Sequence, residues 1–373
     1  MLSSVAKRRV ATAWRRSMQG MASAPQLGGG NPEVVVVPEP QQDKRKSSLP
    51  AVLPAVLRER QASPTRNNST YGRYDVQHVL GKGRFGVVRL GVDRESEKGH
   101  HVALKEISKK HDSPIVQAEL DLLRDLMTLN ELNKVFSTFY TVPLDILETE
   151  DKYVIVLEYL CGGDLFDRIM IKGHVEEVYL RPVIKTMLKE IVLLHENGIV
   201  HRDIKPENVM FRRKGEPSSE EFPHSHQNAD KVPWDRLEPV LCDFGLSYKN
   251  GSDALDIPAG TFGYAAPEML SRERRTSRAC DIWSLGVTMY SSLAGELPFP
   301  ASSDGSITLE QHLAEAFRGP RFKSARFANV SEEACDLISQ MLHYSPYTRI
   351  DMESVLRHPW FSCDLPKPPA PLP

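Results

Sequence analysis

The chain has 373 residues, of which 40% are hydrophobic and 26% are charged, an ordinary composition for a globular protein with a sizeable core. No apolar run approaches the roughly 18 residues of a membrane span, so we expect a soluble protein without membrane partners. The five cysteines are scattered without metal-ligand spacing, which favours a reducing compartment over a disulfide framework: Cys161, Cys242, Cys280, Cys335 and Cys363.

The small net charge hides an asymmetry between the start of the chain and the rest. Residues 1–70 carry eleven Lys and Arg and four Asp and Glu, a balance of +7, and the remainder has a balance of −9. The acidic balance of residues 71–373 argues against nucleic acid as the main partner, and it favours a basic peptide as the substrate.

Residues 1–72 do not have the pattern of a packed domain, because Gly, Pro and basic residues are frequent and the one apolar run is short. We expect a largely disordered basic arm. Its first 32 residues contain five Lys and Arg but no Asp or Glu, and the four Arg fall in one arc of a helical wheel, which resembles a mitochondrial presequence. A basic arm on a cytoplasmic protein is the alternative, and we favour it.

The folded region begins near residue 74 with a glycine-rich turn, Gly81-Lys-Gly83-Arg-Phe-Gly86, between two expected strands at 74–80 and 87–92. Because no helix follows the turn, the pattern does not fit a dinucleotide-binding motif. Glycines instead allow the backbone of a hairpin to close over phosphate groups without obstruction by side chains.

A lysine and a glutamate follow on the next two expected elements. Lys105 ends a strand at 102–105, and residues 115–129 have apolar side chains at helical spacing. Glu119 falls on the inner side of that helix. A buried glutamate needs a cation, so we expect Glu119 to pair with Lys105. An outward-facing helix carboxylate is the alternative.

A buried strand is expected at 153–159, and a long helix at 175–197 ends at a good stop signal, Asn197-Gly198. The segment 201–208 follows at once. Within it, Asp203 can accept a proton from a hydroxyl nucleophile, Lys205 can neutralise charge on a transferred phosphoryl group, and Asn208 can offer an amide oxygen to Mg²⁺. Taken alone, the segment can also be a polar loop between two core elements.

Asp243, in the motif Cys242-Asp-Phe-Gly245, is a second candidate ligand for a cation such as Mg²⁺. An unusually long stretch precedes it. Residues 212–239 are rich in Glu, Ser, Pro and His, and we expect them to form a surface loop insertion.

Over residues 74–361 these motifs resemble those of protein kinases, in one order and with segment 201–208 as H-R-D-x-x-x-x-N. Lys205, two residues after Asp203, is typical of the serine/threonine class. Segments 158–166 and 358–361 are most similar to the calcium/calmodulin-dependent kinase group. The implied fold is α+β and bilobal: an antiparallel β small lobe with one helix (74–160), a mainly α-helical large lobe (161–361) and a Pro-rich tail (362–373).

The resemblance also implies a site for ATP and Mg²⁺ between the lobes. Catalytic roles would fall on Asp203, Lys205, Asn208, Lys105 and Glu119, and Mg²⁺ would be held by Asn208 and Asp243. The nucleotide would contact Leu80, Gly81, Gly83, Gly86, Val88, Ala103, Lys105, Leu157, Glu158, Leu160, Asp164 and Met210. By the same resemblance, Thr261 would bond to Asp203 and Lys205, Glu268 would pair with Arg349, and Asp281 would hold the backbone of segment 201–208.

The implied activity is transfer of the γ-phosphoryl group of ATP to Ser or Thr of protein substrates by a monomeric enzyme. Asp164, Asp167 and Glu207 would line the cleft and favour Arg three residues before the acceptor. One alternative is a pseudokinase scaffold, which usually lacks a site Lys, Asp or Asn; here all are present. The other is a kinase that phosphorylates a small molecule or a lipid, and the peptide-binding motif Ala266-Pro-Glu268 argues against it.

Overall fold

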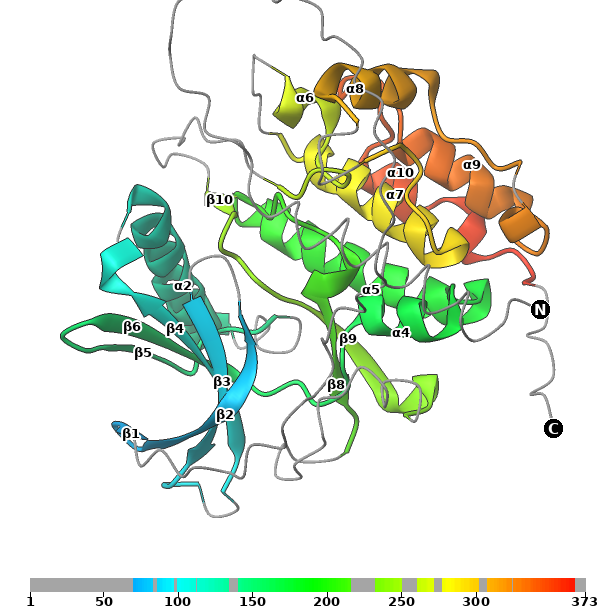
Figure 1. The fold of residues 1–373 in the computed structure, drawn as a ribbon. Coiled ribbons are helices and arrows are strands. Elements are labelled where there is room, and N and C mark those ends of the chain that lie inside the picture. Colours follow the sequence, from blue (N-terminus) through cyan, green and yellow to red (C-terminus); the bar gives the residue numbers. More distant parts are fainter. Residues whose placement is uncertain are drawn as a thin grey trace, which may run out of the picture.

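The computed structural model describes residues 70–82, 86–96, 99–111, 113–133, 140–215, 232–249, 260–271, 277–301, 307–323 and 325–365. These residues form a β-rich small lobe and a helical large lobe, and Figure 1 shows the β8–β9 hairpin where the two lobes meet, below α5. The bilobal α+β fold expected from the sequence is therefore confirmed.

The small lobe is an antiparallel sheet with helix α2 (Pro114–Asn133) packed on one face. Side chains alternate across β4, so Val102 and Leu104 join the core on one face and Ile107 packs with α2 residues on the other. Lys105 shares the face of Ile107, which aims it toward α2. The strand order is β1-β2-β3-β4-β6-β5, with bounds Thr70–Tyr71, Tyr74–Lys82, Gly86–Asp93, His101–Ser108, Lys152–Glu158 and Asp145–Glu148.

Strand β1 differs from the expectation, because residues 70–72 were assigned from the sequence to the N-terminal arm. Gly72 has a φ of 56°, a left-handed conformation that glycine adopts without strain. The resulting turn brings Tyr71 opposite Tyr74 and adds β1 to the sheet. Residues 1–69, with the rest of the predicted arm, lie outside the described residues.

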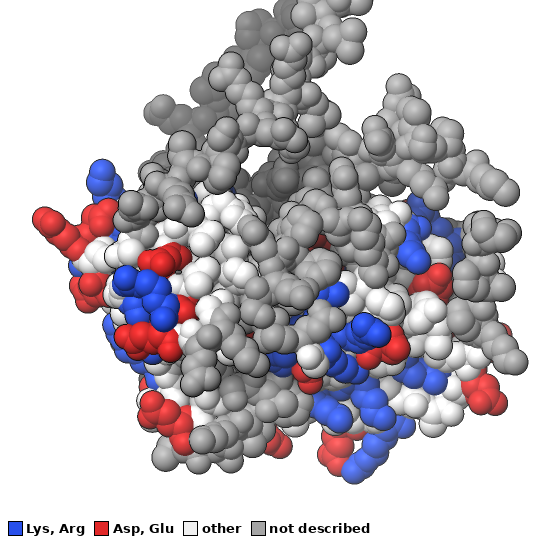
Figure 2. All heavy atoms as spheres, turned by 90° about the horizontal axis from the view of Figure 1, so that it is seen from below, with Lys and Arg blue, Asp and Glu red and all other residues white. Residues whose placement is uncertain are grey.

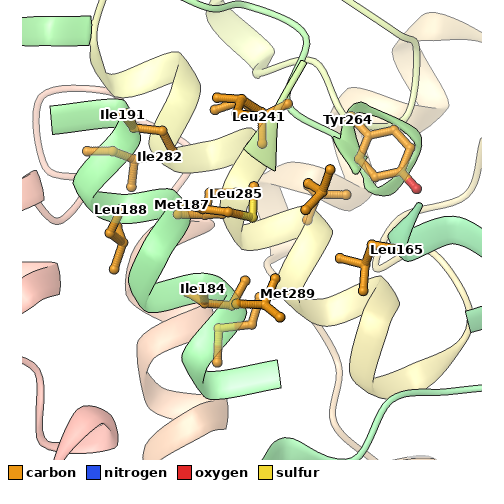
Figure 3. Close-up of a cluster of buried hydrophobic side chains, with 14 of the residues drawn as sticks. Leu165, Ile184, Met187, Leu188, Ile191, Leu241, Tyr264, Ile282, Leu285 and Met289 are labelled. Carbon is orange, nitrogen blue, oxygen red and sulfur yellow. The ribbon is translucent and has the colours of Figure 1, made fainter. Parts of the chain in front are cut away.

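The large lobe is built around α7 (Ala279–Ala294), which is buried on every side, as expected of a helix inside a core. Figure 3 shows α7 and α5 (Glu177–Glu196) packing through apolar side chains, among them Ile184, Met187, Leu188, Ile191, Ile282, Leu285 and Met289. The other helices are α4 (Leu165–Lys172), α6 (Pro267–Leu270), α8 (Leu309–Arg318), α9 (Glu332–Met341) and α10 (Met352–Leu356). None of the helices in the described ranges is long and apolar enough to cross a membrane.

The predicted insertion connects two paired strands, β8 (Val209–Arg213) and β9 (Leu237–Leu241). Its outer residues, 212–213 and 237–239, belong to these strands. Val209 and Phe211 alternate toward the core, and the pairing of β8 with β9 continues from them to Arg213 and Leu237. Its C-terminal end packs on the large lobe, where the ring of Trp234 stacks on Tyr179 at 5.6 Å between centroids. Residues 216–231 of the insertion lie outside the described residues.

Charged side chains of both signs are mixed on the face shown in Figure 2. Exposed ion pairs of this kind, such as Arg73–Glu95 at 3.2 Å, stabilise a fold little. A different pair is buried: the guanidinium of Arg349 contacts Glu268 at 2.7 and 2.9 Å, with its side chain fully buried. The Glu268–Arg349 pair implied by the resemblance is thus confirmed, and its burial makes it a determinant of stability.

Arg349→Met should remove the charge while keeping much of the side-chain length. Glu268 would then be a buried carboxylate without its cation, and we expect a loss of about 3–5 kcal/mol in the free energy of unfolding, measured by urea denaturation. Arg357→Met is the matched control, because Arg357 and Glu353 form an exposed pair on α10 and its flank. The interpretation is wrong if the two variants lose the same stability.

Candidate active site

The backbone of segment 201–208 is hydrogen-bonded to Asp281 of α7. The carboxylate of Asp281 accepts hydrogen bonds from the backbone N–H of His201 at 2.9 Å and of Arg202 at 2.8 Å, as the resemblance implied, and it also contacts Nε2 of His195 at 2.8 Å. Arg202 has a φ of 68°, which is unfavourable for a residue with a side chain. The buried Asp281 therefore stabilises a backbone turn that the segment would not adopt alone.

Asp203 is the centre of a hydrogen-bonded group. Its carboxylate accepts from the backbone N–H of Thr261 at 2.9 Å and from the Thr261 hydroxyl at 2.7 Å. The ammonium of Lys205 lies 2.6 Å from Asp203 and 2.8 Å from the Thr261 hydroxyl, and Asn208 donates its amide N–H to the Asp203 carbonyl at 2.8 Å. The expected Thr261 contacts are confirmed, and the Asp203 carboxylate is fixed in one orientation.

Lys105 joins three segments that are far apart in the sequence. Its ammonium lies 2.6 Å from the Glu119 carboxylate on α2 and 3.0 Å from Asp243, so the predicted pairing with Glu119 is confirmed. Burial opposes the charge of Lys105, but Asp243 and Glu119 outweigh this effect and raise the pKa of the ammonium above its usual value. Lys105 in turn holds the pKa of Asp243 well below its usual range. The ionised Asp243 carboxylate therefore stabilises the folded state at neutral pH, and this contribution is lost as the pH falls through the acid range and Asp243 becomes protonated.

Asn208 and Asp243 lie on adjoining backbone, because the N–H of Cys242 donates to the carbonyl of Asn208 at 2.9 Å. The amide nitrogen of Asn208 is used toward Asp203, which leaves its side-chain oxygen as an acceptor. The Asp243 side chain is half exposed and ionised. Mg²⁺ in nucleotide sites takes one or two such protein oxygens together with phosphate oxygens. The two residues therefore fit the predicted metal role, although within the described ranges no cluster of three His, Cys, Asp or Glu forms a metal site.

The predicted nucleotide residues fall into neighbouring groups on the two lobes. Gly81 pairs with Val88 across β2 and β3, and Ala103 pairs with Leu157 across β4 and β6. A Cβ at Gly86 would lie 1.7 Å from the Glu106 carbonyl oxygen, so this position requires glycine. Leu80 precedes Gly81 within β2, where the register between β2 and β3 shifts, and Gly83 lies outside the described residues.

On the other side of the site, Leu160 and Met210 pack with Val240 and Cys242 in one buried cluster. Asp164 forms a β-bridge with Met210, and its carboxylate accepts from the N–H of Asp167 to cap helix α4. The structure therefore brings Leu160, Asp164 and Met210 together where the small lobe joins the large lobe.

Arg212 is a charged residue at the site that sequence reasoning missed, because it was assigned to the insertion. In the structure its guanidinium contacts Glu158 at 2.7 and 2.6 Å and Glu238 at 3.1 Å. The sequence did contain a signal for this position: apolar residues alternate at Val209 and Phe211, which predicts that the strand continues to Arg212.

Comparison with known proteins agrees with this geometry. A family model described as the protein kinase domain matches residues 74–361. The chain is 32% identical over 305 residues to calcium/calmodulin-dependent protein kinase type 1 of Caenorhabditis briggsae, an alignment covering 80% of this chain and 76% of the relative. It is 35% identical over 304 residues to calcium-dependent protein kinase 13 of Arabidopsis thaliana, covering 80% of this chain and 51% of the relative. It is also 30% identical over 308 residues to serine/threonine-protein kinase cds1 of Schizosaccharomyces pombe, covering 79% and 59%.

Proposed function

The chain belongs to the protein kinase family and is a serine/threonine kinase most like the calcium/calmodulin-dependent group, and on this basis we propose that it transfers the γ-phosphoryl group of ATP to Ser or Thr hydroxyls of protein substrates. The observation that supports the proposal most is the oriented carboxylate of Asp203, which Thr261, Lys205 and Asn208 hold in place. A pseudokinase would need neither this orientation nor the neighbouring lysine.

In the proposed reaction, the substrate hydroxyl oxygen forms a bond to the γ-phosphorus as the bond to the leaving ADP oxygen breaks. Asp203 accepts the hydroxyl proton, and its contacts with Thr261 keep the accepting oxygen in position. Lys205 carries its charge beside Asp203, where burial opposes that charge but Asp203 outweighs it and raises the pKa of Lys205. The ammonium can therefore stabilise negative charge on the phosphoryl oxygens throughout the reaction.

Lys105 and the backbone amides of the glycine-rich turn would hold the phosphates, and Glu119 keeps the ammonium of Lys105 directed at them. Asn208 and Asp243 would hold Mg²⁺, which when bound supplies charge neutralisation on the phosphate oxygens. Leu80, Val88, Ala103, Leu157, Leu160 and Met210 would enclose the adenine, and Asp164 would lie near the ribose. Most of the rate enhancement would come from positioning and charge.

Asp203→Asn should abolish transfer and leave ATP binding intact, because it removes the proton acceptor and keeps the residues assigned to the phosphates. We expect kcat on a peptide to fall about 100- to 10,000-fold and the dissociation constant of ATP to stay unchanged. The control is Asp121→Asn, an exposed carboxylate on α2. Wild-type turnover by Asp203→Asn contradicts the assignment, and ATP binding without transfer by the wild-type chain favours the pseudokinase.

For substrate preference, we propose that Glu207 and Asp164 favour an Arg three residues before the acceptor. Glu207 supports this, because its Oε2 has no hydrogen-bond partner among the described residues and the residue as a whole, unlike Asp167, is only half-buried. A substrate guanidinium would supply the missing partner. Asp167, also expected to line the cleft, is buried on α4 and is removed from the proposal.

A positional peptide library should show selection for Arg at that place, with replacement by Ala lowering kcat/KM roughly tenfold. Glu207→Gln should reduce this selection and affect peptides without Arg much less. Selection for acidic residues, or for Pro directly after the acceptor, contradicts the proposed preference.

We further propose a monomeric enzyme without a nucleic-acid partner. For the compartment we favour the cytoplasm over the mitochondrion, because the acidic body and the basic first 32 residues together fit a solvated arm. Residues 1–32 fused to a fluorescent protein should leave it in the cytoplasm, and import into mitochondria contradicts this assignment.

A further inference from the structure

The backbone of β8 is joined to the segment that leaves the hinge, which we define as residues 158–160 between β6 and the large lobe. The N–H of Gly162 donates to the carbonyl of Phe211 and the N–H of Phe211 donates to the carbonyl of Gly163, both at 2.9 Å. A Cβ at Gly162 would lie 2.6 Å from the Phe211 carbonyl oxygen. The close approach of the two backbones therefore requires glycine at position 162. The two hydrogen bonds fix the segment that follows the hinge against β8.

Alternation along β8 places Met210 and Arg212 on one face and Phe211 on the other. Phe211 is fully buried in the large-lobe core, while Met210 packs with Leu160, Val240 and Cys242. Arg212 therefore extends from the strand face that already contacts the hinge residue Leu160.

From that face, the Arg212 guanidinium reaches back to the hinge. Its Nε and Nη2 contact the two carboxylate oxygens of Glu158 at 2.7 and 2.6 Å, a two-point contact that fixes orientation as well as distance. Its Nη1 contacts Glu238 at 3.1 Å, directly across the hairpin. The side chains of Arg212 and Glu158 are 22% and 32% exposed, so solvent screens this pair less than it screens fully exposed ones.

We propose that Arg212 is a positioning residue for the nucleotide, which holds the Glu158 carboxylate and thereby fixes the hinge backbone against β8. This inference rests on the proposed function, where the hinge is assigned to the adenine. Arg212 and Glu238 also lie at the two ends of the loop 214–236, so the same contacts couple the base of the insertion to the hinge. Loss of the contact weakens nucleotide binding and leaves proton transfer at Asp203 unaffected.

The test compares Arg212→Gln, Arg212→Lys and the control Arg213→Gln in the full-length chain. Each is assayed by direct ATP binding and by steady-state transfer to a peptide. We expect Arg212→Gln to raise the dissociation constant and KM of ATP about fivefold, with kcat and the peptide KM within about twofold of wild type. Arg212→Lys, which keeps the charge but cannot make the two-point contact, should fall between Arg212→Gln and wild type. Arg213 is the next residue and points to the other face of β8, so Arg213→Gln should bind ATP as wild type does.

A double-mutant cycle with Glu158→Gln separates positioning from general stability. If Arg212 and Glu158 act through their contact, the variant with both substitutions should bind ATP no more weakly than whichever single variant has the lower ATP affinity. Additive losses in ATP binding overturn the proposal, as does a lowered melting temperature of Arg212→Gln with unchanged ATP affinity. A wild-type chain that neither binds ATP nor transfers phosphate refutes the proposed function itself. Normal wild-type activity with unchanged ATP affinity in Arg212→Gln refutes this inference alone.

Discussion

The arrangement of the two lobes depends on the charge of Lys105. A partly buried ammonium is unfavourable unless carboxylates surround it, and here one comes from α2 and the other from the Asp-Phe-Gly motif of the large lobe. Moving either element away would remove one of the two carboxylates that stabilise the Lys105 ammonium, and moving α2 would also expose Glu119, which is 4% exposed. The position of α2 and that of Asp243 are thus coupled through one cation, which also lies where the phosphates of ATP are proposed to bind.

In the large lobe, buried polar groups likewise fix the positions of neighbouring segments, as Lys105 does for α2 and Asp243. Asp281 and Arg349 are almost completely enclosed, and each contacts a distant segment: Asp281 accepts from the backbone of His201 and Arg202, and Arg349 binds Glu268 and the carbonyl of Ala279. Such contacts permit only one arrangement, because any other would leave a charged group unpaired in an apolar core. The strained turn at Arg202 is tolerated for this reason, and the orientation of Asp203 follows from it together with the contacts of Thr261.

The β8–β9 hairpin shows how a long insertion can be accommodated next to the site. Its two strands are paired and its end packs on α5 through Trp234 and Tyr179, so the register is fixed by contacts outside the long connection. The strand that carries the insertion also contributes Met210 and Arg212 near the hinge. The base of the insertion and the part of the site proposed for the nucleotide therefore belong to one hairpin.

The sequence by itself determined the family and the fold, and it named most residues of the candidate site, because the proposed phosphate binding, proton acceptance and metal binding each need particular residue types at particular spacings. Helices at 115–129 and 175–197 were predictable from apolar periodicity, and they appear as α2 and α5 with slightly different ends. The pairing of Glu119 with Lys105 was predictable because a buried carboxylate needs a cation.

Only the tertiary structure decided which of several nearby polar residues meet. Asp167 was expected in the cleft but is buried on α4, and Arg212 was expected in a loop but contacts the hinge. Lys105 meets Asp243 across 138 positions of the sequence. Periodicity describes local structure alone. These contacts depend on strand register and on the packing of distant segments, which the order of residues does not reveal until the chain is folded.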